Sequence, residues 1–318
     1  MLTSKISTIP KLVVFLSVFL PVTFLTVTLR AQQISGIDEK RKTIANVADT
    51  LIKLSDHLYA IISNGEAGNI AAYENQDGWV LVDDQWVELS PKIKNLLASI
   101  SSKPVKYILN THFHYDHSDG NKVFGKEGAV IISHDNIRRR LESQQVLSLS
   151  NLVQRPYPFE ALPFITFSDS LTLHEADEQI KIFHVKNAHT DGDSFIEFIG
   201  ANVVHTGDVF VTYGFPFIDA NSGGNIYGMI DAINMLINSV NDNTRIIPGH
   251  GPICYKKDLV TYRDMLITVE GRVKYGIEHN LSIEEIKQQN PLKDMKFQTD
   301  YYFSLEMIYD MVKNRLHK

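Results

Sequence analysis

Cysteine is almost absent from this chain of 318 residues, and so is any excess of positive charge. The single cysteine, Cys254, excludes an internal disulfide bond and a cysteine-based metal cluster. The 31 Lys and Arg residues are outnumbered by 37 Asp and Glu residues, and the net charge is −6. Because nucleic acid is bound by a basic face, we expect no nucleic-acid partner.

One long apolar run is present, over residues 12–29, and it carries no charged residue. Lys5 and Lys11 precede it, and Ala31 lies just beyond its end. A positive segment, an apolar segment and a small boundary residue are typical of a secretory signal. The run is also close to the ~20 residues that span a bilayer. We therefore expect residues 1–31 to send the chain to the periplasm or the outside, as a cleaved signal or as a retained membrane anchor, with the membrane a partner only in the second case.

The rest of the chain alternates short apolar runs with Gly, Asn and Asp turns, which is typical of strands. After a polar segment at 32–49, which we expect to be flexible, strands are predicted at 57–62, 69–73, 79–83, 105–109, 129–133, 170–173, 180–185, 194–199, 201–206 and 245–248. Spacings of three and four apolar residues predict helices at 137–144, 226–240, 259–273, 282–288 and 305–316. A further helix should start with Ser90 as its N-cap and Pro91 at its first position.

These elements predict an α/β domain over residues 50–255, with sheets packed face to face and helices outside, followed by a helical extension over 256–318. The segment Asn151–Ser168 has prolines and aromatic residues without a clear period, which indicates a surface loop and a candidate substrate lid.

Histidine is the informative residue type, and four potential metal ligands stand in the run His112-Phe113-His114-Tyr115-Asp116-His117. The run directly follows the strand predicted at 105–109. Packing needs none of these four side chains, and protonated imidazoles so close together would repel one another. Imidazoles with a carboxylate suit zinc, and also iron or manganese.

Three more polar residues follow predicted strands in the same way: His189, Asp208 in a Thr-Gly-Asp sequence, and His250 in a Gly-His-Gly sequence. Each alone is weak, since an aspartate after Thr-Gly is often a turn former and Gly-His-Gly is often a loop. Their order after the histidine run makes them a strong pattern.

The pattern resembles the metallo-β-lactamase superfamily, whose members carry a His-x-His-x-Asp-His run and then a histidine, an aspartate and a histidine. The resemblance covers roughly residues 55–255 and implies a four-layer αββα sandwich with two metals at one edge, expected to be two zinc ions per chain, with iron or manganese as alternatives. Carried over by position, the first metal would be held by His112, His114 and His189, the second by Asp116, His117 and His250, and Asp208 would bridge the two.

The resemblance implies a hydrolase in which a metal-bound hydroxide attacks a small-molecule substrate. Two divalent metals about 3.5–4 Å apart lower the pKa of a shared water towards ~7. Asp116 is expected to orient this nucleophile and to take part in proton transfer. Since histidine ligands need a partner on the second ring nitrogen, Thr190, Asp193 and His205 are candidates for that role, or else turn and strand-end residues with no part in catalysis. We expect cleavage of an ester, lactone, thioester or amide.

Two alternatives stay open. Familiar β-lactamase subclasses replace the residue at position 208 or at position 117, whereas this chain keeps Asp208 and His117, which is more similar to the glyoxalase II, lactonase and general-hydrolase branches. Hydrolysis of β-lactams is thereby made less favoured without being excluded. The other alternative is a non-catalytic metal-binding or scaffolding protein, against which the complete seven-residue set argues. The aromatic stretch 213–217 and the residues 221–225 form a pocket wall or a packed connecting loop.

Overall fold

The computed structural model describes residues 41–65, 67–147, 152–295 and 305–317. The strands are β1 (Asp49–Lys53), β2 (Leu58–Ser63), β3 (Ile70–Glu74), β4 (Trp79–Val82), β5 (Val105–Leu109), β6 (Val130–His134), β7 (Gln145–Leu147), β8 (Leu152–Gln154), β9 (Ile165–Phe167), β10 (Ser170–His174), β11 (Gln179–His184), β12 (Ser194–Phe198), β13 (Val203–His205) and β14 (Arg245–Ile247). The α-helices are α2 (Ser90–Ala98), α3 (Tyr115–Ser118), α4 (Asn121–Phe124), α5 (Asp135–Leu141), α6 (Ile226–Ser239), α7 (Lys256–Glu278), α8 (Ile283–Gln288) and α9 (Leu305–Leu316). Short 3-10 helices are η1 (Val87–Leu89), η2 (Phe159–Ala161), η3 (Gly207–Val209) and η4 (Ala220–Ser222).

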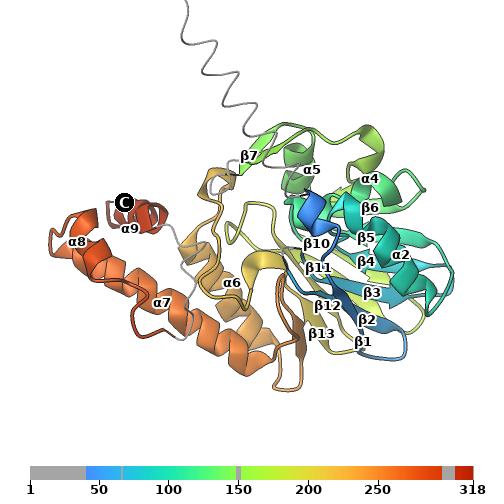
Figure 1. Ribbon diagram of the computed structural model, residues 1–318. Helices are drawn as coiled ribbons and strands as arrows, with labels where there is room; N and C mark the ends of the chain where they lie inside the picture. Colours follow the sequence, from blue (N-terminus) through green and yellow to red (C-terminus); the bar gives the residue numbers. More distant parts are fainter. Residues whose placement is uncertain (1–40, 66, 148–151, 296–304, 318) are drawn as a thin grey trace, which may run out of the picture.

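Two large sheets form the centre of the domain (Figure 1). One has seven strands in the order β1-β2-β3-β4-β5-β6-β9, antiparallel up to β4 and parallel from β4 to β9. The other has five strands in the order β10-β11-β12-β13-β14, of which only the pair β13 and β14 is parallel. The small hairpin of β7 and β8 stands apart from both.

A strand that is buried on both faces contributes side chains to two different hydrophobic cores, and β2 is an example. Successive side chains of a strand point to opposite faces. Leu58 and Ala60 accordingly pack between the two sheets, where they meet residues such as Ile182 and Phe198 of the five-stranded sheet. Tyr59 and Ile61 point the other way, into a second core. This explains why β2 is a continuous apolar run rather than an alternating one.

Helices cover the outer face of each sheet. Residues of α2 and α5, among them Ile93 and Ile137, close the core behind the seven-stranded sheet. Residues of α6, α7 and α9, among them Ile233, Leu266 and Ile308, close the core behind the five-stranded sheet. Figure 1 shows α6 lying between that sheet and α7. The result is the four-layer αββα sandwich expected from the resemblance.

The sequence interpretation was wrong for part of Asn151–Ser168. Asn151 lies outside the described residues, but the segment contains β8, η2 and β9 rather than a continuous loop. β9 joins the edge of the seven-stranded sheet parallel to β6. A three-residue strand is too short for a visible alternation, and its pairing partner lies some thirty residues away in the sequence.

Two expected boundaries also differ. Ser90 is the first residue of α2 and not its N-cap, because the 3-10 turn η1 leads directly into the helix; the side chain of Leu89, at the N-cap position, makes no capping bond. Part of the segment expected to be flexible is packed, since Ile44 is buried in the core behind the seven-stranded sheet. The other domain boundaries stay predictions. The apolar run 12–29 lies outside the described residues, and no helix within the described ranges is long and apolar enough to cross a membrane.

Candidate metal centre

All seven predicted ligands lie at one edge of the sandwich, because of how the strands run. β4 and β5 are parallel in one sheet, and β11, β13 and β14 run in a common direction in the other. The carboxyl ends of these strands therefore meet at the same edge. His112 follows β5, His189 follows β11, and Asp208 and His250 follow β13 and β14. Four loops, far apart in the sequence, thus converge there.

Three histidines form the first group, His112, His114 and His189. All three are buried. His114 Nδ1 lies 3.0 Å from His189 Nε2, and the ring of His112 is edge-on to both of the others. One nitrogen from each ring lies within 4.8 Å of the other two, so one cation could contact all three.

The second group consists of Asp116, His117, Asp208 and His250. His250 Nε2 lies 3.1 Å from Asp116 Oδ2 and 3.4 Å from His117 Nε2. The carboxylate of Asp116 is 21 % exposed, against 8 % for that of Asp208. Asp116 is therefore the acid of the site that solvent and substrate can reach.

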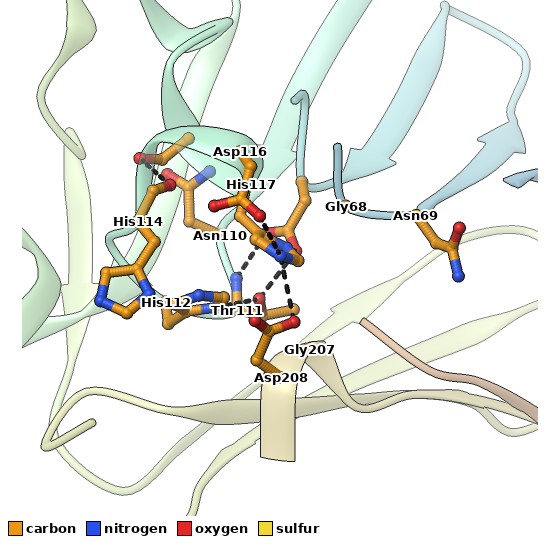
Figure 2. Close-up of polar contacts among 12 residues, drawn as sticks. Gly68, Asn69, Asn110, Thr111, His112, His114, Asp116, His117, Gly207 and Asp208 are labelled. Carbon is orange, nitrogen blue, oxygen red and sulfur yellow. Dashed lines mark hydrogen bonds and ion pairs between the residues drawn. The ribbon is translucent and has the colours of Figure 1, made fainter. Parts of the chain in front are cut away.

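Asp208 stands between the two groups. Its Oδ1 lies 3.1 Å from His117 Nε2, and its Oδ2 lies 3.8 Å from His189 Nε2. Figure 2 shows Asp208, which belongs to η3, facing His117, which belongs to the short helix α3. One carboxylate oxygen for each group is the arrangement that a bridging ligand requires.

In four of the five ligand histidines, the ring nitrogen that faces away from the other ligands, here called the outer nitrogen, has a hydrogen-bond partner. The sequence analysis did not identify these four partners. His117 Nδ1 lies 2.7 Å from Asp83 Oδ2, and His114 Nε2 lies 3.1 Å from Asp219 Oδ2. Two more of the five rings have neutral partners: the Thr111 hydroxyl for His112, and the backbone carbonyl of Phe217 for His189. Such partners fix which nitrogen faces the metal and how the ring is turned.

Thr190, Asp193 and His205, the candidates from the sequence analysis, make hydrogen bonds that fix nearby backbone and do not bond to ligand imidazoles. Asp193 accepts hydrogen bonds from the backbone N–H and the hydroxyl of Thr190, which fixes the turn that carries His189. His205 Nδ1 accepts from the N–H of Gly207, and its Nε2 donates to the carbonyl of Asn69. The interpretation of these three as partners of ligand imidazoles was therefore wrong.

The two groups differ in protonation state when no metal is bound. Burial, and then the neighbouring His114, lowers the pKa of His189 to about 4, and burial also lowers the pKa of His112 well below its usual value. Burial would lower the pKa of His250 as well, but Asp208 and Asp116 outweigh it and raise that pKa to about 9. Burial would raise the pKa of Asp116, but His117 and His250 bring it down to about 2. At neutral pH His112 and His189 are therefore neutral, whereas the second group is a cluster of ion pairs.

The residues present fit a pair of divalent cations. The buried His112 Nε2 has no hydrogen-bond partner, although its ring is held on the other side by Thr111. The spacings of 3.0 and 3.4 Å between imidazole nitrogens are close to the ~3.3 Å expected between two nitrogens that are each ~2.0–2.1 Å from a tetrahedral zinc. Two glycines pack directly against ligands of the second group and leave no room for a larger residue. A Cβ at Gly249 would lie 1.9 Å from Asp208 Oδ1, and a Cβ at Gly68 would lie 2.3 Å from the His117 ring.

An αββα sandwich with buried His and Asp groups at the edge of its sheets defines a divalent-metal hydrolase. Residues 64–250 match the family model of the metallo-beta-lactamase superfamily, which covers more than half of the chain. The chain belongs to the metallo-β-lactamase superfamily.

Among curated proteins, a hydroxyacylglutathione hydrolase of Pelagibacter ubique is 31 % identical over 147 residues, which are 46 % of this chain and 52 % of that enzyme. The match thus spans about half of the length of that relative. A probable metallo-hydrolase of Methanocaldococcus jannaschii is 26 % identical over 158 residues, 48 % of this chain and 72 % of the relative.

Solved structures agree on the fold. A metallo-beta-lactamase from Pontibacter korlensis superposes with a TM-score of 0.57 at 15 % identity, over 69 % of this chain and 99 % of the other. A stereoselective inverting sec-alkylsulfatase from a Pseudomonas species gives a TM-score of 0.61 at 15 % identity, over 84 % of this chain and 50 % of the other.

Proposed function

We propose that this chain is an exported hydrolase that holds two zinc ions and uses activated water to cleave an ester, lactone, thioester or amide bond. The observation that carries the proposal is the complete set of seven residues, in two groups that share Asp208. A non-catalytic protein would have no need for an acid such as Asp116 at the accessible side of the site. Iron or manganese would fit the same ligand types.

The chemistry divides between the metals and the chain. When bound, two divalent cations at this site would lower the pKa of a water molecule and polarise the bond to be cleaved. Asp116, the most exposed acid of the site, is close enough to His250 to be held in one orientation. Its low pKa keeps it a carboxylate at neutral pH, so that it can accept a hydrogen bond from the attacking water and orient it.

The surroundings of the site favour an uncharged or weakly acidic substrate. Phe217 stacks on His114 at 6.0 Å between ring centroids, and Tyr213 lies 5.8 Å from the His250 ring. Both side chains are half-buried, so together they form aromatic walls beside the two groups. The charged groups that shift the pKa values of Asp116 and His250 are histidines and aspartates, with no Lys or Arg among them. Apart from the metal ions, a substrate carboxylate would therefore find no Lys or Arg among these groups.

The thioester arm of the proposal is supported by the Pelagibacter relative, whose name states that it acts on hydroxyacylglutathione. Hydrolysis of β-lactams is the competing activity. The structural likeness to a metallo-beta-lactamase supports the fold alone at 15 % identity.

The test is a screen of the purified chain against lactones, esters, thioesters and β-lactams, with and without a chelator, and with the metal content measured in parallel. We expect about two metal ions per chain and chelator-sensitive turnover of an ester, lactone or thioester. Turnover confined to β-lactams would favour the alternative, and the absence of turnover at full metal loading would favour a binding protein.

Export is proposed from residues 1–31 alone. Fractionation of expressing cells, with the N-terminal mass of the recovered chain, tests it: a start near residue 32 means a cleaved signal, and an intact start in the membrane fraction means an anchor. Recovery of the intact chain in the cytosol would contradict export.

A further inference from the structure

Two phenylalanine side chains of one short segment, residues 159–164, are largely exposed to solvent. Phe159 and Phe164 are each 77 % exposed, although phenylalanine is usually buried. They lie on either side of Ala161 and Leu162, whose side chains are buried. Ile165, the first residue of β9, adds 37 % of its surface. We call Phe159, Phe164 and Ile165 the phenylalanine patch.

Basic side chains border the patch, together with the exposed acids Glu142 and Glu160. Arg155 is exposed four residues before Phe159, and Arg138 of α5 donates a hydrogen bond to the backbone carbonyl of Pro163 and pairs with Glu142 at 2.9 Å. The exposed Lys126 lies beside η2, because a Cβ on the preceding Gly125 would touch the backbone of Glu160. Figure 1 shows α4 and α5, which carry these contacts, at the end of the molecule away from α8 and α9. Exposed aromatic residues bordered by Lys and Arg are typical of surfaces that lie at the headgroup level of a bilayer.

The patch is connected to the place where the N-terminal segment enters the described structure. Arg41, the first described residue, donates to Asp119 at 3.0 Å. Lys122 also pairs with Asp119, and its ammonium lies 4.2 Å from the centroid of the Tyr157 ring. Tyr157 stands two residues before Phe159. A short series of contacting side chains therefore links Arg41 to the patch.

We infer that the phenylalanine patch rests on a lipid surface, with the rings of Phe159 and Phe164 in the headgroup region and the basic residues facing lipid phosphates. The apolar run 12–29 ends only eleven residues before Arg41. Eleven extended residues reach at most about 40 Å, so a run that lies in a bilayer holds Arg41, and the surface beside it, close to that bilayer. The inference rests on residues 12–29 being retained as the proposed membrane anchor, and it does not depend on the reaction that the site catalyses.

The experiment places a tryptophan at the patch in the full chain. Phe159→Trp and Phe164→Trp are each reconstituted into vesicles of phosphatidylcholine and phosphatidylglycerol whose acyl chains carry bromine, a short-range quencher. Tyr275→Trp on α7, where the native side chain is 56 % exposed, is the matched control. The natural Trp79 and Trp86 are buried and give a constant background. We expect the emission of the two patch variants to shift to shorter wavelength and to lose intensity, and the control to change in neither respect.

Equal quenching at all three positions would mean that the domain tumbles freely on its tether, and this overturns the inference. Absence of quenching at positions 159 and 164 does the same. A shift to shorter wavelength that appears without quenching and grows with protein density would assign the patch to a second copy of the chain. Turnover of the site is measured on the same samples, so that loss of lipid contact and loss of catalysis are read separately.

Discussion

The Nδ1 atom of His117 lies 2.7 Å from Oδ2 of Asp83, and both side chains are fully buried. The same carboxylate oxygen accepts the hydroxyl of Thr111, whose Oγ1 in turn lies 3.0 Å from His112 Nδ1. One carboxylate therefore orients a histidine of each group, although it is 0 % exposed and contacts no expected metal position.

Replacing this carboxylate should weaken metal binding without removing a ligand. We expect Asp83→Asn to lower metal affinity by about 10–100-fold, because the imidazole of His117 loses its charged partner. Competition with a chromophoric chelator measures the affinity. Asp77→Asn, in the exposed turn before β4, is the control. Equal metal affinities of the two variants would refute the role of Asp83 in orienting His117.

Asp116 should matter for turnover far more than for folding. We expect Asp116→Asn to lower kcat by about 10²–10⁴-fold, since the amide cannot accept a proton from the attacking water. Asp56→Asn, where the carboxylate is 92 % exposed, should leave kcat unchanged. Metal content is measured on both, because Asp116 is also an expected ligand. A fully active Asp116→Asn variant would contradict the mechanism.

Two glycines separate an effect on the site from an effect on the fold. Alanine at position 249 would place a Cβ 1.9 Å from Asp208 Oδ1, so we expect Gly249→Ala to displace that carboxylate and to lose metal and activity. Gly271→Ala, inside α7 with no atom within 4 Å of its new Cβ, should keep activity and raise the free energy of unfolding by about 0.5–1 kcal/mol. Urea unfolding and metal analysis check both, and a Gly249→Ala variant with a full metal complement would contradict the close packing.

Removal of metal should lower stability. A ligand present at a hundredfold excess over its Kd stabilises the folded state by about 2.7 kcal/mol. For 318 residues, with about 2.1 cal/mol/K of unfolding entropy per residue, that corresponds to a fall in Tm of roughly 4 °C on chelation. Calorimetry before and after chelation, and after zinc is restored, measures it. An unchanged Tm at proven metal loss would argue against a metal that bridges the two sheets.

The metal-free protein should respond to pH in the opposite sense to the metal-bound one. Because Asp208 and Asp116 raise the pKa of His250 from 6.5 to about 9, this group stabilises the metal-free fold fully below pH 6.5 and loses that effect as the pH rises through about 9. Metal must displace the proton, so metal affinity should rise over the same interval. Titration calorimetry in buffers of different ionisation enthalpy should show protons released on binding at pH 7. Binding without proton release would contradict the raised pKa.

The seven site residues were predictable because the signal is local: each follows an apolar strand, and all keep one order along the chain. Asp83 carries the same signal after β4 and could have been recognised by it. Asp219 could not, since it lies between the aromatic stretch 213–217 and residues 221–225 without a strand before it, and only the tertiary fold brings it to His114. β8 and β9 were missed because edge strands of three residues are defined by distant partners rather than by their own pattern.

The difference in protonation between the first and the second ligand group has a consequence when metal is scarce. An arriving cation finds unprotonated nitrogens on His112 and His189 of the first group, whereas at the second group it must compete with protons on His117 and His250. Under scarcity the molecules would therefore hold a single ion each, on the same side, before any of them held a second. The activity would then depend gradually on the metal supply. The pH would set how much metal is needed to fill the second group.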